Sequence, residues 1–211
     1  MLNGTKKRSR FTAKFAFALA LVLSLSGTSF AELAGMGDSN APTEEKSERG
    51  IKALIGIGGG NSMITDDGTI FMALRIGLDF GKLLSAGMWY VTTISDVRNY
   101  NVPQKQLVNY NSFGAFVELF PLRFNEQMSV SVPIRVGGGA VNALENGDEG
   151  FESEDYFFVA DMAAHFNYRI TKMLEVSIGG GYRMFAGIEE NNLENMDFCT
   201  PFGELRFTIR E

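Results

Sequence analysis

The sequence has 211 residues, a net charge of −6 and 45% hydrophobic residues, with a single cysteine and a single histidine. One cysteine excludes an internal disulfide, and one histidine excludes metal sites built from several histidines. The acidic balance argues against nucleic-acid binding, which needs a basic patch to neutralise phosphates.

The N-terminus has the pattern of a secretory signal peptide. Five basic residues flank the start of an apolar run from Phe15 to Leu25, and the small residues Ser29 and Ala31 form a cleavage pattern. We therefore expect residues 1–31 to be a signal peptide and the protein to be exported. Loss of the five basic residues leaves 14 Lys and Arg against 25 Asp and Glu, a net charge of −11. Residues 32–50 are small, polar and charged, which predicts a flexible leader.

From Ile51 to the end, residues 51–211, the chain follows a period of two. The segment from Ile70 to Phe80 has an apolar side chain at every even position, whereas its odd positions include Arg75 and Asp79. This pattern predicts a β-strand with two different faces. Segments 128–138, 156–170, 173–184 and 204–209 alternate in the same way, and segments 51–59, 83–94 and 107–120 do so less clearly. Eight strands are therefore expected, and since no later segment has 18 consecutive apolar residues, no transmembrane helix is expected.

The connections between these strands alternate in length. Residues 60–68, 95–106, 141–155 and 186–197 read as long polar loops, whereas residues 81–82, 121–126 and 171–172 read as short turns. Long loops on one rim, with short turns and both termini on the other, are typical of outer-membrane barrels. The predicted fold class is all-β, an eight-stranded antiparallel up-and-down transmembrane β-barrel.

The polar faces of the strands indicate what fills the barrel. They consist mostly of Gly, Ser and Ala with one or two charges per strand, which suits a narrow lumen rather than a surface in water. Because buried charges must be paired, we expect an ion-pair network inside, with Arg75, Arg135, Asp161 and Glu204 meeting as one group near mid-height. The full predicted network is Arg75, Arg135, Asp161, Glu204, Arg206, Arg183, Glu175 and Glu118, with Lys52 and Asp79 among the other interior charges.

Aromatic residues lie near the predicted strand ends and are interpreted as interfacial girdles. They are Phe80, Tyr90, Tyr110, Phe120, Tyr156, Tyr168, Tyr182, Phe185 and Phe198.

Residues 51–211 as a whole resemble the small outer-membrane β-barrel superfamily represented by OmpX, OmpW and the membrane domain of OmpA. Within them, FFVADMAAHFNYRITKMLEVSIGGGYR is similar to the next-to-last hairpin of uncharacterised barrels of this kind, a strand, a Thr-Lys turn and a Gly-rich strand ending in Tyr-Arg. The resemblance implies a bacterial outer-membrane location, contact with outer-membrane lipid and insertion by the barrel-insertion machinery. It implies no catalytic or ligand residues, and we expect a monomer without cofactor or metal.

Three functions follow as hypotheses. The first is a non-enzymatic outer-membrane barrel that serves envelope integrity, surface interaction or small-solute handling. The second is a secreted, soluble, lipocalin-like barrel that binds an apolar ligand, which would invert the two faces. The third is a barrel lipid hydrolase, in which His165 is expected opposite Glu175 and Ser177 as a catalytic trio. Acidic loops could also bind a divalent cation, although a solvated surface is the commoner outcome.

Overall fold

The computed structural model describes residues 51–64, 67–81, 83–99, 106–145, 152–188 and 193–211. The predicted signal peptide (1–31) and leader (32–50) lie outside these residues. Within the described segments, no helix has both the length and the apolar character needed to cross a membrane.

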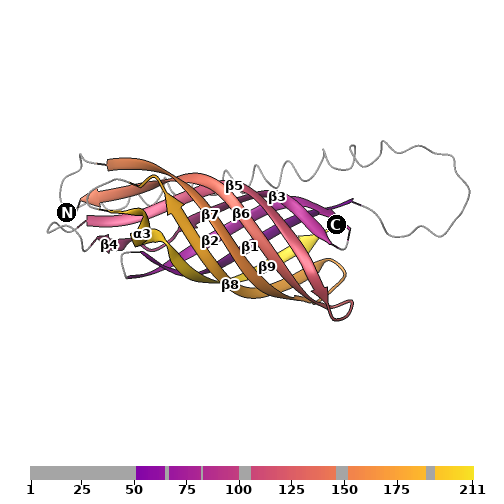
Figure 1. Cartoon of the computed structure of the whole chain (residues 1–211). Coiled ribbons are helices and arrows are strands. Elements are labelled where there is room, and N and C mark those ends of the chain that lie inside the picture. The colour runs from indigo at the N-terminus through magenta and orange to yellow at the C-terminus, as the bar shows by residue number, and fades with distance from the viewer. Residues whose placement is uncertain (1–50, 65–66, 82, 100–105, 146–151, 189–192) are drawn as a thin grey trace, which may run out of the picture. The chain divides into compact units, whose positions relative to one another are not determined.

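Nine described strands form one antiparallel sheet (Figure 1). They are β1 (Ile51–Ile64), β2 (Asp67–Phe80), β3 (Leu84–Thr93), β4 (Val97–Asn99), β5 (Gln106–Arg123), β6 (Met128–Glu145), β7 (Glu152–Arg169), β8 (Leu174–Ala186) and β9 (Thr200–Arg210). The sheet closes because β1 pairs with β9 and β3 pairs with β5. The three-residue β4, which the sequence did not predict, only extends the edge of β5. The other eight strands form the predicted eight-stranded antiparallel up-and-down barrel, and this prediction is confirmed.

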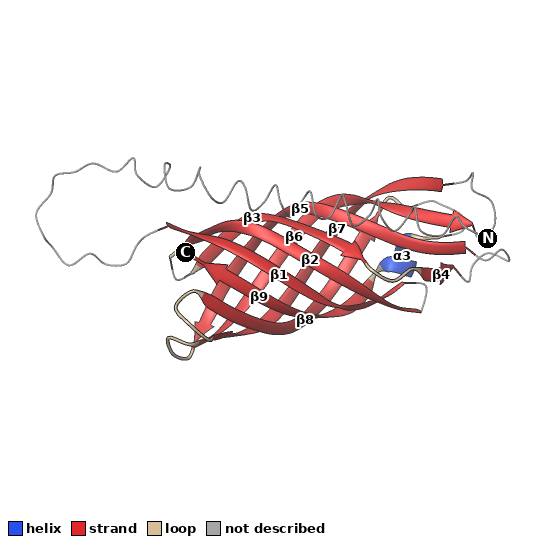
Figure 2. Cartoon of the chain, turned by 180° about the vertical axis from the view of Figure 1, so that it is seen from behind, coloured by secondary structure: helices blue, strands red, loops and turns tan. Residues whose placement is uncertain are grey.

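The two ends of the barrel differ. The short turns after β2, β5 and β7 lie at the same end as Ile51 and Glu211, and we call this end the turn side. Glu211 is held there by backbone hydrogen bonds with Ala53 of 2.8 and 2.9 Å. The opposite end, the loop side, carries β4 and the short helix α3 (Asn195–Phe198). Figure 2 shows the C-terminus at one end of the barrel and both of these elements at the other.

Three of the four predicted long loops, 60–68, 95–106 and 141–155, are wrong in part, because strands extend into them or lie within them. β1 and β2 stay paired as far as Ile64 and Asp67, so most of 60–68 is hairpin strand. β6 and β7 are paired from Leu144 and Glu152 onward, and β4 lies within 95–106. Polar residues here occupy both faces of each strand, so the alternation that reveals a strand is lost although backbone pairing continues.

The apolar face of the sheet points outward. Ile70, Phe113, Met162 and Ile178, from four different strands, are 57%, 60%, 59% and 62% exposed. The charged and small residues of the alternate positions point into the lumen, where Arg75 and Arg135 are buried. The soluble, lipocalin-like alternative required the reverse arrangement.

The aromatic girdle prediction holds for only part of its residues. Five of the nine aromatics are exposed on the outer surface, namely Phe80, Tyr90, Tyr156, Tyr168 and Tyr182. The other four, Tyr110, Phe120, Phe185 and Phe198, are at most 5% exposed. Tyr110 and Phe185 occupy inward positions of their strands. The direction of these side chains therefore follows from the alternation along the strand and not from their nearness to its end.

Candidate functional site

The most distinctive feature of the barrel is its charged lumen. Among the described residues, five arginines and five carboxylates form ion pairs inside the barrel, and all ten are buried. They are Arg75, Arg135, Arg183, Arg206 and Arg210 with Asp79, Glu118, Asp161, Glu175 and Glu204. The equal numbers make this set neutral, which is how buried charges avoid a large desolvation penalty.

Glu118 of β5 is the centre of the middle group. Its Oε1 accepts a hydrogen bond of 2.6 Å from Nη2 of Arg206 on β9, and its Oε2 pairs with Nη1 of Arg75 on β2. The Ser131 hydroxyl donates a further hydrogen bond of 2.6 Å to Oε1. Nη2 of Arg75 donates to the Thr208 hydroxyl at 3.0 Å. One fully buried carboxylate thus joins three non-adjacent parts of the barrel wall.

A second group lies toward the loop side and is centred on Asp161 of β7. Its two oxygens pair with Nε of Arg135 at 2.6 Å and with Nε of Arg183 at 3.0 Å. Arg135 also pairs with Glu204 at 3.0 Å. Nη1 of Arg183 donates to the Tyr110 hydroxyl at 2.6 Å. Arg135 and Arg183 lie on the two strands next to β7, whereas the pair between Arg135 and Glu204 joins β6 to β9.

Aromatic rings close the lumen above this group. The Arg183 guanidinium lies 5.0 Å from the centre of the Phe71 ring and 4.8 Å from that of Phe202, a cation–π arrangement. Further toward the loop side, Phe185 packs edge-on against Tyr110 at 5.3 Å and in a tilted arrangement against the Phe198 ring of α3 at 5.6 Å. The short helix therefore places a fully buried ring over the lumen.

A third group lies near the turn side and depends on Arg210 of β9. Its Nε pairs with Asp79 and its Nη1 with Glu175, each at 2.6 Å, and the Ser85 hydroxyl donates to Asp79. Arg210 was missed in the sequence, although it continues the inward positions Glu204, Arg206 and Thr208. The alternation of inward and outward residues along β9 could have identified Arg210 as an interior charge.

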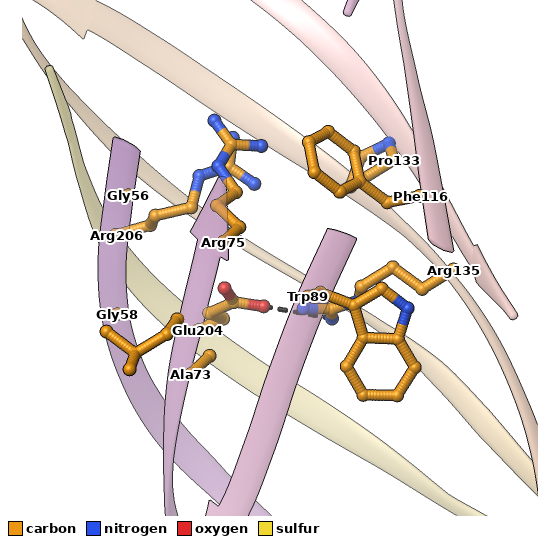
Figure 3. Close-up of a pocket in the computed structure, with 11 residues that line it drawn as sticks. Gly56, Gly58, Ala73, Arg75, Trp89, Phe116, Pro133, Arg135, Glu204 and Arg206 are labelled. Carbon is orange, nitrogen blue, oxygen red and sulfur yellow. Dashed lines mark ion pairs between the residues drawn. The ribbon is translucent and has the colours of Figure 1, made fainter. Parts of the chain in front are cut away.

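One small pocket lies among these charged residues. Figure 3 shows a pocket in which the carboxylate of Glu204 is paired with Arg135, while the guanidiniums of Arg75 and Arg206 lie side by side. Trp89 and Phe116 form part of its wall, and its volume is about 10 Å³. A cavity of this size has room for about one water molecule.

The structure places all eight predicted network residues in the lumen, but not in the predicted grouping. Arg135, Asp161 and Glu204 meet as expected, whereas Arg75 pairs with Glu118 in the separate middle group. Lys52, counted among the interior charges, is exposed at the turn-side rim. Partners across the lumen depend on how the sheet closes, which the alternation along one strand does not determine.

His165 does not form the hypothesised catalytic trio. It lies opposite Gly179, whereas Ser177 lies opposite Asn167 and Glu175 opposite Arg169. A side chain at position 179 would overlap the His165 ring, because its Cβ would come within 2.1 Å of Cδ2. The ring is 1% exposed, its Nε2 is 4.0 Å from Glu204, and neither ring nitrogen has a hydrogen-bond partner among the described residues. The expected position of His165, opposite Glu175 and Ser177, was therefore wrong, because His165 lies opposite the next inward residue of β8, Gly179.

Within the described segments, no group of three or more His, Cys, Asp or Glu residues is arranged to hold a metal ion. Several of the acidic residues considered for a divalent cation lie outside those segments: Asp66, Asp148, Glu149, Glu189 and Glu190.

Removal of the Tyr110 hydroxyl tests the second group. Tyr110→Phe leaves Nη1 of Arg183 without its 2.6 Å acceptor, and hydrogen bonds to charged groups contribute most in buried sites. We expect the free energy of unfolding to fall by about 1–3 kcal/mol. Urea unfolding in lipid vesicles measures this, with the exposed Tyr156→Phe as the matched control. Equal effects of the two changes would contradict the assigned role of the hydroxyl.

The fold and lumen together define a class of protein: a closed, eight-stranded up-and-down barrel with an apolar exterior and a polar interior that contains buried ion pairs. No protein-family model and no curated protein matches the chain.

Solved structures with similar folds do exist. Neisserial surface protein A is 13% identical, with a TM-score of 0.54 over 76% of this chain and 95% of that one. Ail, the attachment invasion locus protein of Yersinia pestis, solved in complex with the heparin analogue sucrose octasulfate, is 14% identical, with a TM-score of 0.51 over 76% of this chain and 99% of that one. At such identities the similarity is one of fold. The predicted resemblance to small eight-stranded outer-membrane barrels is confirmed at that level.

Proposed function

We propose that the chain is a non-enzymatic barrel of a bacterial outer membrane that passes no solute through its lumen and acts through its loop-side surface. The observation that carries this proposal is the neutral set of ion pairs that fills the lumen inside an apolar outer wall.

The outer wall supports the membrane location. Ile134 of β6 lies between Val117 and Met162 of its neighbouring strands, and all three are 41–59% exposed. A continuous apolar surface of this kind causes association in water but suits a bilayer. Closure of the sheet also pairs the backbone groups of the wall, as hydrocarbon requires.

The plugged lumen supports a role outside the lumen. With room for about one water molecule, the pocket beside Arg135 and Glu204 offers no path for a solute. Among the three roles considered, small-solute handling is therefore the least favoured, which leaves envelope integrity or surface interaction. The name of Ail refers to attachment, which fits a surface role for this fold.

The partner at the loop side is expected to differ from that of Ail. The Ail structure contains a polyanion, sucrose octasulfate. In this chain, residues 145–155 contain six Asp and Glu and no Lys or Arg. Repulsion between like charges argues against a polyanionic ligand here.

Fractionation tests the membrane proposal. The protein is expected in the outer-membrane fraction, and unheated samples should migrate differently from boiled ones in a denaturing gel, because a closed barrel resists detergent unfolding. A product that is freely soluble in the periplasm would contradict the proposal.

Conductance tests the plugged lumen. The purified protein in a planar lipid bilayer is expected to produce no stable current steps, since ion pairs and aromatic rings occupy the lumen. Arg135→Ala/Glu204→Ala removes a matched pair beside the pocket and is expected to admit more ions than the wild type. Stable porin-like steps from the wild type would show that the lumen is open.

A further inference from the structure

The pocket of Figure 3 lies where two of the charged groups approach each other. Arg75 and Arg206 of the middle group line one part of it, and the Arg135–Glu204 pair of the second group lines another. Among the described residues, no ion pair and no side-chain hydrogen bond joins the middle group to the second group. The pocket is therefore the place where a bound molecule could connect them.

Four polar atoms of these residues have no hydrogen-bond partner in the part of the chain that the structure describes. They are Nε of Arg75, Nε of Arg206, Nη2 of Arg135 and Oε2 of Glu204. The last two atoms lie 3.0 Å apart as an ion pair, but not in the direction of a hydrogen bond. All four residues are at most 7% exposed. Because a buried polar atom without a partner costs free energy, these atoms favour a polar ligand in the pocket.

The pocket has the size of one small ligand. Its volume of about 10 Å³ is close to the smallest that holds a water molecule. Two of its lining positions, Gly56 and Gly58 of β1, have no side chain. A Cβ at position 56 would lie 2.8 Å from Nε of Arg75, and one at position 58 would lie 3.3 Å from Oε1 of Glu204. The two glycines therefore leave this guanidinium and this carboxylate uncovered.

We propose that the pocket binds a single water molecule. The water donates a hydrogen bond to Oε2 of Glu204 and accepts hydrogen bonds from the Nε–H groups of Arg75 and Arg206. Three hydrogen bonds are the usual number for a buried water in a protein. The water thus joins the middle group to the second group across the lumen. This site does not depend on the loop-side surface role proposed above.

The charges of the lumen favour a neutral ligand over an ion. The five interior arginines and five interior carboxylates already balance, so a bound anion would add one uncompensated buried charge. An anion would also lie beside the Glu204 carboxylate, and a cation would lie beside three guanidiniums. Water avoids both conflicts, because it donates to the carboxylate and accepts from the guanidiniums. Cavities that stay dry are lined by apolar side chains, unlike this one.

Nuclear magnetic resonance of the full-length protein in lipid nanodiscs tests this site. The protein is labelled with ¹⁵N in arginine, and magnetisation transfer from water to each Nε–H group is measured in the rotating frame. In that measurement, direct transfer and chemical exchange have opposite signs. Arg75 and Arg206 are expected to show direct cross-peaks with water, because the bound water lies within hydrogen-bond distance of both Nε–H groups.

Arg183 is the internal control. Its Nε–H donates to Asp161 at 3.0 Å, and it does not line the pocket. Its Nη1 also donates to a hydroxyl, that of Tyr110. Nη2 of Arg75 likewise donates to the Thr208 hydroxyl. Transfer relayed through an exchanging hydroxyl would therefore give Arg183 the same signal as Arg75. We expect no water cross-peak for the Nε–H of Arg183.

Ala73→Val fills the pocket. Ala73 of β2 is buried and lines the pocket, so two further methyl groups at this position take the space of the water. The water cross-peaks of Arg75 and Arg206 should be lost, while heat-modifiable migration shows that the barrel is folded. Exchange of chloride for bromide in the buffer needs no variant and tests the alternative ligand, an anion. It should leave the Nε–H resonances of Arg75 and Arg206 unchanged.

Each contrary result overturns the water site. Absence of the two cross-peaks in the wild type, an equal cross-peak for Arg183, or persistence of the cross-peaks in folded Ala73→Val would do so. A bromide-dependent shift confined to Arg75 and Arg206 would show that the pocket binds an anion instead. If Ala73→Val failed to fold, the wild-type cross-peaks, the Arg183 control and the bromide exchange would still decide the question.

Discussion

Glu118→Gln is expected to lower the free energy of unfolding of the barrel by about 3–5 kcal/mol. The substitution keeps the shape of the side chain but removes the charge that joins Arg75 and Arg206 in the middle of the lumen. Two guanidiniums would then remain buried without a carboxylate, and removal of one partner from a buried ion pair costs far more than the intact pair contributes. Urea unfolding in lipid vesicles, followed by Trp89 fluorescence, measures the change.

Glu126→Gln is the matched control for this experiment. Glu126 is exposed in the turn between β5 and β6, so the same chemical change removes no buried charge. We expect its effect to stay within about 0.5 kcal/mol, as for ordinary surface substitutions. If the two variants unfolded alike, Glu118 would not be the centre of the middle group.

Ile134→Arg is expected to destabilise the membrane-inserted barrel by about 2–4 kcal/mol and to reduce its amount in the outer membrane. Ile134 faces outward between Val117 and Met162, within the apolar wall. A guanidinium there would lie in hydrocarbon, far from the headgroups. Unfolding in vesicles and quantitative fractionation measure the two effects.

Met196→Arg separates this effect from a general intolerance of arginine. Met196 is 73% exposed, more than Ile134, but it belongs to α3 at the loop side rather than to the apolar wall. Little change in stability is expected. Equal losses from both substitutions, or tolerance of Ile134→Arg, would contradict the position of the membrane.

The faces of the strands could be predicted because they depend on local periodicity. Leu74 and Arg75, or Ile134 and Arg135, are neighbours in sequence, and neighbouring side chains of a strand always point to opposite faces. The same rule would have found Arg210 and would have placed Tyr110 inside. Arg210 was missed and Tyr110 was assigned to the outer girdle because the alternation was not followed to the ends of their strands.

The ends of the strands could not be predicted in this way. β6 extends to Glu145 and β7 begins at Glu152, so both strands enter the predicted loop 141–155, where polar residues occupy both faces and the composition resembles that of a loop. Backbone hydrogen bonds between the two strands hold this region, and they leave no mark on side-chain periodicity.

Alternation along the chain, together with the connection lengths and the composition of the polar faces, predicted by itself a barrel of eight strands with apolar residues outside and paired charges within. Only the tertiary structure decided which charges meet: Glu118 of β5 joins Arg75 of β2 and Arg206 of β9, and Arg210 joins Asp79 and Glu175. The physical reason is that side-chain direction is a property of each strand alone, whereas contacts across the lumen depend on the stagger at which all eight strands close.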